Sequence, residues 1–213
     1  MKRLRNALIN RKDMVSGRII VNILDKADAD GLMHSVAVAE VASIIGKQSG
    51  IGERGQSELW LAGLLHDIGK LGVPNKVLHR KKPSPADLQY MQKHVTIGKF
   101  ITDRLFSGSS LGRTIEAHHE CYDGSGYPHG LAGENIPLDA RILAIADYYD
   151  AARSAGWILT HRTHDAVMGE IFARKGKEFD PQFVKAAVKA SVKIQLAHEA
   201  VHATKHDDLA KWL

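Results

Sequence analysis

Apolar residues recur at helical spacing along most of the chain and predict an all-α protein. Residues 29–45 carry one apolar face, and Gly46 marks the expected end of that helix. Residues 57–68 are more continuously apolar, which predicts a buried helix. No useful stretch alternates apolar and polar residues as a half-buried strand would. The pattern therefore favours a helical bundle.

Turn residues divide the rest of the chain. Ser84 followed by Pro85 predicts the start of a helix that runs to about Phe106, because serine caps helices and proline suits their first turn. Glycine and proline make 123–137 the longest irregular segment. Residues 108–110 are expected to form a turn, followed by a helix through His119. Further helices are expected over 139–152, over 163–173, and as one final helix after the Asp180–Pro181 cap.

Composition and charge narrow the class of protein. With 213 residues, 44% of them hydrophobic, the chain can bury a full core, and we expect residues 1–28 as a helical extension before one domain at 29–213. A net charge of +5 favours an anionic ligand, although a solvated basic surface explains it equally well.

Cys121 is the single cysteine, which excludes an internal disulfide. With no apolar run long enough for a membrane span or signal core, a cytoplasmic location is expected.

Two adjacent pairs of metal-ligating residues, His66-Asp67 and His118-His119, carry the candidate chemistry. Neighbouring side chains on a helix point about 100° apart, so the members of a pair can serve different ions. Asp67 is the natural bridge, because each of its two oxygens can take one ion. Lys70, one turn further on, would place a positive charge near a reacting phosphate.

Single residues on other predicted helices can complete such a site. Imidazoles with carboxylates and no thiolates suit iron or manganese over structural zinc, and two such ions would activate water and hold phosphoryl oxygens. The candidate ligands are His34, His66, Asp67, His94, His118, His119 and Asp147.

Each of these signals has an ordinary alternative. A lone histidine is more often a core or surface residue than a ligand, and a His-Asp dipeptide occurs by chance. His198, His202 and His206 recur every four residues on the last helix and could chelate a metal in isolation. The interpretation favoured here is a polar stripe on a solvated helix face. The metal site is favoured because all the other elements occur together in one order.

Long motifs in this order resemble the HD-GYP family, a branch of the HD phosphohydrolase superfamily. The resemblance covers roughly residues 30–184 and is most specific over 118–137, which reads HHExxDGxGYPxGLxGxxIP. It also includes HDIGKxGxP over 66–74 and ARIxxIADxxDA over 140–151. The resemblance implies an all-helical HD-type bundle with two or three iron or manganese ions in its core, and hydrolysis of cyclic dinucleotides, chiefly cyclic di-GMP.

The resemblance also implies residue roles. The candidate ligands become metal ligands, with Asp67 bridging and catalytic, His34 serving a third ion, and Asp30 standing where the family has a glutamate. Lys70 becomes a catalytic and phosphate-contacting group. Tyr127 lies in the name-giving Gly-Tyr-Pro loop, near the substrate and available to a protein partner such as a diguanylate cyclase domain.

Two departures from the family pattern concern substrate binding. Ala37 stands where an arginine is usual, and Gly156 to Leu159 replace an Arg-Pro-Tyr-Arg-like element that contacts the substrate phosphates. The candidate substitutes are Arg153, Arg162 and the Arg80-Lys81-Lys82 cluster. The leading hypothesis is a phosphodiesterase yielding pGpG or GMP. The alternatives are a binding or interaction module that retains the metals but turns over little, and an HD phosphohydrolase acting on a different nucleotide.

Overall fold

A computed structural model describes residues 29–106, 109–154, 162–205 and 208. The proposed helical extension at 1–28 lies outside these residues. Within them the secondary structure is helical, with two isolated bridges, Asp123 to Ala132 and Lys175 to Phe179, and no strand. The all-α prediction is confirmed.

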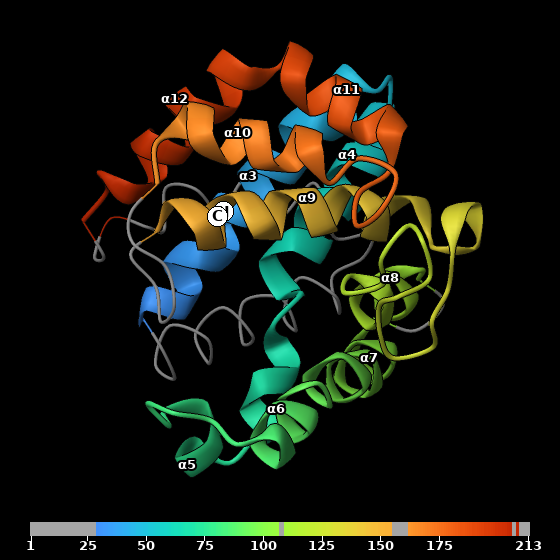
Figure 1. Ribbon diagram of the computed structural model, residues 1–213, viewed down its shortest axis with the longest axis vertical. Coiled ribbons are helices and arrows are strands. Elements are labelled where there is room, and N and C mark those ends of the chain that lie inside the picture. Colours follow the sequence, from blue (N-terminus) through green and yellow to red (C-terminus); the bar gives the residue numbers. More distant parts are fainter. Residues whose placement is uncertain (1–28, 107–108, 155–161, 206–207, 209–213) are drawn as a thin grey trace.

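Two long helices form the centre of the bundle, α3 (Ala29–Gln48) and α9 (Leu138–Arg153), which pack on each other (Figure 1). Their apolar faces are buried together with the second half of α4 (Glu53–Leu65), in one continuous core. A close-packed core of this kind fixes the relative positions of the helices that carry the predicted ligands.

The remaining elements cover two sides of this centre. The helices α10 (His164–Ala173), α11 (Pro181–Lys189) and α12 (Ser191–His202) lie on one side, shown in orange to red (Figure 1). The other side carries α7 (His94–Leu105) and α8 (Leu111–Ala117), with α5 (Asn75–Leu78) and α6 (Pro85–Met91) beyond them. Two 3-10 turns, η1 (Ile68–Gly72) and η2 (Gly133–Asn135), complete the order.

Helix boundaries differ from the sequence predictions at several places, and the helix expected over 57–68 spans Glu53–Leu65. The first helix continues through Gly46, where a Cβ would lie 2.7 Å from Leu59, and a positive φ of 85° at Gly50 follows its end. Gly46 thus allows close helix packing and is no cap. The helix expected over 85–106 is two, separated at Gln92 and Lys93, and the final helix is interrupted at Ala190.

Both predicted side-chain caps are present. The Ser84 hydroxyl accepts a hydrogen bond from the Asp87 backbone N–H, and the Asp87 carboxylate accepts one from the Ser84 backbone N–H. Together the two bonds make a capping box. Asp180 accepts from the backbone N–H of Gln182. No helix in the described part of the chain combines the length and hydropathy needed to cross a membrane.

Candidate metal centre

The predicted ligands lie mostly at the ends of separate elements, and the fold brings them together. His66 follows α4, Asp67 precedes η1, His94 begins α7, and His118 and His119 follow α8. The two central helices contribute His34 from α3 and Asp147 from α9. Asp30 lies on α3, but its side chain is outside the described residues.

Three of the ligand histidines are oriented by the backbone of their own segment. In each, Nδ1 donates to the carbonyl three residues earlier: His66 to Gly63 (2.8 Å), His94 to Met91 (2.7 Å) and His118 to Ile115 (2.7 Å). Because a carbonyl oxygen can only accept, the proton must sit on Nδ1, and Nε2 presents its lone pair. That is the tautomer a metal ligand requires.

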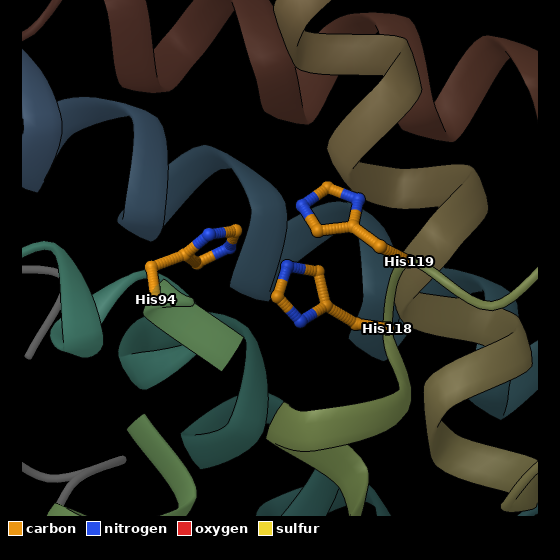
Figure 2. Close-up of side chains that lie close together, drawn as sticks. All are labelled: His94, His118 and His119. Atoms are coloured by element: carbon orange, nitrogen blue, oxygen red, sulfur yellow. The ribbon is translucent and has the colours of Figure 1, made fainter. Parts of the chain in front are cut away.

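His94, His118 and His119 form one candidate ligand group, whose rings face a common space (Figure 2). The ring centroids lie 5.5 Å apart for His94 and His118, and 4.0 Å apart for His118 and His119. The Nε2 atoms of His94 and His118 are buried without a hydrogen-bond partner among the described residues. Buried polar atoms are normally partnered, so this donor set fits a divalent cation.

Asp67 links this group to a second, carboxylate-rich group, which contains His34, His66 and Asp147 together with Asp67 itself. Its Oδ1 lies 3.6 Å from Nε2 of His94, while its Oδ2 lies 3.3 Å from Nε2 of His66. Asp147 places Oδ1 3.2 Å from Nε2 of His34 and 3.6 Å from that of His66. The Asp67 carboxylate thus faces both groups with different oxygens, the arrangement of a bridging ligand.

Electrostatics distinguish the two groups. Burial lowers the pKa of His118 well below its usual value and that of His119 to about 4, so both stay neutral. Burial also disfavours charge on His34, but Asp147 and Asp150 outweigh it and raise its pKa to about 10. The carboxylates of Asp67 and Asp147 likewise raise the pKa of His66 to about 9. The carboxylate-rich group therefore attracts positive charge, from a proton or a metal ion.

Lys70 and Tyr127 border the centre. Nζ of Lys70 lies 2.5 Å from Oδ2 of Asp67, and the Tyr127 ring stacks on His119 with centroids 5.0 Å apart. Gly126 makes this approach feasible, because a Cβ there would lie 2.2 Å from the backbone nitrogen of Cys121. The buried carboxylate of Glu120 accepts from backbone N–H groups further along the same loop.

The two arginines expected at the substrate have partners within the chain. Arg153 donates to the carbonyl of Arg162 (2.9 Å) and lies 3.4 Å from Glu199 on α12. The guanidinium of Arg162 pairs with Glu170 on α10. The Gly156 to Leu159 replacement lies outside the described residues.

Sequence reasoning missed a further cluster behind His34. Asp150, one turn after Asp147, accepts from Nδ1 of His34 through Oδ2 (2.6 Å). Its Oδ1 lies 2.7 Å from Nε2 of His202 and 2.9 Å from Nε2 of His198. The interpretation of His198 and His202 as a solvated stripe is therefore wrong, because α12 packs this face against α3. His206 is outside the described residues. The i, i+4 spacing was the only available signal.

Comparison with known proteins places this geometry in a family. Residues 18–183 match the HD domain family. A cyclic di-GMP phosphodiesterase response regulator, RpfG of Xanthomonas campestris, is 38% identical over 165 residues, covering 74% of this chain and 43% of the relative. A cyclic di-GMP phosphodiesterase of Thermotoga maritima is 35% identical over 181 residues, covering 82% and 49%. A 3'3'-cGAMP-specific phosphodiesterase of Vibrio cholerae is 37% identical over 138 residues, covering 64% and 32%.

Solved structures agree on the fold. A cyclic GMP-AMP-specific phosphodiesterase of V. cholerae superposes with a TM-score of 0.60 at 22% identity, over 80% of this chain and 46% of the other. An HDG"Y"P protein from Bdellovibrio bacteriovorus gives 0.59 at 20% identity, over 82% and 60%. The chain spans less than half the length of the three curated relatives above. With its helical bundle and buried histidine–aspartate centre, the chain belongs to the HD domain family.

Proposed function

We propose that this chain is a metal-dependent phosphodiesterase that hydrolyses a cyclic dinucleotide. The observation that carries the proposal is the pair of buried Nε2 atoms of His94 and His118, which find no hydrogen-bond partner among the described residues. The Nε2 atom of His94 also lies 3.6 Å from Oδ1 of Asp67. A packing role explains neither their burial nor their orientation. Two ions in this centre, with a third where His34 and Asp30 complete a site, account for both.

The residues around the centre suit phosphoryl chemistry. When bound, divalent ions activate water for attack on phosphorus and neutralise the phosphate oxygens. Asp67 would bridge the two ligand groups and fix the distance between them. Lys70 would keep a positive charge beside the reacting phosphate. The half-buried Tyr127 ring would offer a stacking surface at the rim. Iron or manganese is the expected metal, because the ligands are imidazoles and carboxylates.

The names of the relatives support a cyclic dinucleotide as substrate. They include enzymes for cyclic di-GMP and for 3'3'-cGAMP, both dianions that suit a chain of net charge +5. We favour cyclic di-GMP, giving pGpG or GMP, in a cytoplasmic protein. The Gly-Tyr-Pro loop also remains our candidate surface for a protein partner such as a diguanylate cyclase domain.

The partners of two arginines predict that this enzyme binds its substrate weakly. Arg153 and Arg162 are held by Glu199 and Glu170, so they reach substrate phosphates only if these contacts break. A weak phosphate clamp raises KM more than it lowers kcat when the lost contacts act equally on ground and transition states. We therefore expect the enzyme to need high substrate concentrations.

The test is anaerobic incubation of the Mn- or Fe-loaded chain with cyclic di-GMP and, separately, with 3'3'-cGAMP, followed by product chromatography. We expect pGpG or GMP from cyclic di-GMP, loss of product in Asp67→Ala, and normal turnover in Asp103→Ala, which removes an exposed aspartate of α7. Cleavage of 3'3'-cGAMP alone would change the substrate assignment. Binding of both dinucleotides without cleavage, at a full metal content, would replace the enzyme by the binding module.

A further inference from the structure

The cluster behind His34 has the composition of a metal site of its own. We call Asp150, His198 and His202 the C-terminal cluster. Each offers a ligand atom, and these atoms lie within 4.8 Å of one another. The two histidines are four residues apart on α12, so they project from the same face of the helix. Asp150 faces them from α9.

Hydrogen bonding does not account for His198. His198 is only 5% exposed, and its Nε2 atom lies 2.9 Å from Oδ1 of Asp150. Yet neither ring nitrogen makes a hydrogen bond with any described residue, so the Nε2 direction misses the carboxylate oxygen. Here a buried imidazole nitrogen lies close to a carboxylate oxygen without the direction that a hydrogen bond needs. This is the geometry expected where both groups bind one cation.

We propose that the C-terminal cluster binds a divalent cation of the zinc class. Two imidazoles and one carboxylate are a common ligand set for Zn²⁺ with one position open, and other first-row ions accept the same donors. The His202 side chain is 29% exposed, which provides access for the ion and a water ligand. The site would clamp α12 onto α9.

This site is distinct from the candidate metal centre. Its histidines lie beyond residue 183, where the match to the HD domain family ends. Asp150 uses Oδ1 toward the C-terminal cluster and Oδ2 toward Nδ1 of His34. An ion in the cluster would therefore fix the carboxylate that orients His34, without sharing a ligand with the main centre.

The experiment counts zinc in the full chain. Metal-free protein is dialysed against buffered Zn²⁺, and bound zinc is measured by mass spectrometry for the wild type and for His202→Ala. His198→Gln is the second variant, and Asp67→Ala disables the main centre alone. His79→Ala, which removes an exposed histidine, is the matched control for adventitious binding.

We expect His202→Ala and His198→Gln each to bind one zinc ion fewer than the wild type, while His79→Ala loses none. Asp67→Ala should keep the zinc ion that His202→Ala loses. The double variant Asp67→Ala/His202→Ala should therefore bind one zinc ion fewer than Asp67→Ala. Equal zinc counts in wild type and His202→Ala would overturn the proposal, as would an equal loss in His79→Ala. Because no cyclic dinucleotide is used, the result stands apart from the proposed catalytic function.

Discussion

A Cβ atom on Gly69 would lie 1.8 Å from the carbonyl oxygen of His94. It would also lie 2.5 Å from the backbone nitrogen of Gly98, so η1 packs directly on the backbone of α7. This contact fixes the distance between the segment that carries Asp67 and Lys70 and the helix that begins with His94. The spacing of three functional residues therefore depends on the absence of one methyl group.

Gly69→Ala should destabilise the fold and displace His94 from Asp67. Overlap with backbone atoms cannot be relieved by a rotamer change, so we expect a loss of more than about 3 kcal/mol in the free energy of unfolding. Gly169→Ala is the matched control, because a Cβ there meets nothing within 4 Å inside α10, and it should stabilise by about 0.5–1 kcal/mol. Urea unfolding followed by circular dichroism measures both, and equal stabilities would contradict the packing argument.

Lys70→Met should lower kcat while leaving the metal in place. The substitution keeps the aliphatic stem but removes the charge beside Asp67, and loss of one stabilising group in an active site costs about 10²-fold or more. Steady-state kinetics with cyclic di-GMP and metal analysis on the same sample check this. Lys99→Met removes a lysine paired with Asp103 on α7 and should be neutral. Loss of metal in Lys70→Met would instead show that Lys70 mainly positions the Asp67 carboxylate as a ligand.

The sequence predicted the main elements and ligands because their signals are local. Ser84 and Asp180 cap helices through side-chain bonds that reach two or three residues. The adjacent ligand pairs lie at helix ends, where the glycines and polar residues that terminate a helix are visible. The break between two helices at Gln92 and Lys93 contains no glycine, proline or capping residue, so the sequence did not predict it.

The C-terminal cluster could not be predicted for a different reason. Asp150 and His202 lie 52 residues apart, and their contact depends on how α12 packs across the centre of the bundle. Polar spacing on a helix is the same whether the face meets water or a buried carboxylate. Only tertiary packing tells the two apart, and here it buries His198.

Arg141→Met should cost about 3–5 kcal/mol of unfolding free energy. Its guanidinium donates to Oδ2 of Asp180 at 2.6 Å, and the side chains are only 11% and 4% exposed. Removal of one partner leaves a buried charge unpaired, which is more costly than the pair itself is stabilising.

The double variant Arg141→Met/Asp180→Asn tests that reason. Asparagine is also a good cap for α11, so the double variant should recover part of the lost stability. The measurement is a urea unfolding series on all four proteins of the cycle. Additive losses would show that the two residues act independently and would contradict the ion pair as the cause.

Glu120→Ala should loosen the loop that carries Tyr127 before it unfolds the bundle. The buried carboxylate accepts from the backbone N–H of His129 at 2.7 Å and of Leu131 at 3.1 Å. Bonds to a charged group contribute about 1.5–3 kcal/mol each, and their loss leaves two backbone donors without this acceptor. We expect faster hydrogen exchange at 129–131, measured by mass spectrometry, and protection largely retained in Glu120→Gln, whose amide oxygen keeps one of the two bonds. Unchanged exchange in Glu120→Ala would show that other contacts hold the loop, among them the bond from the Tyr127 backbone N–H to the His119 carbonyl and the stacking of the two rings.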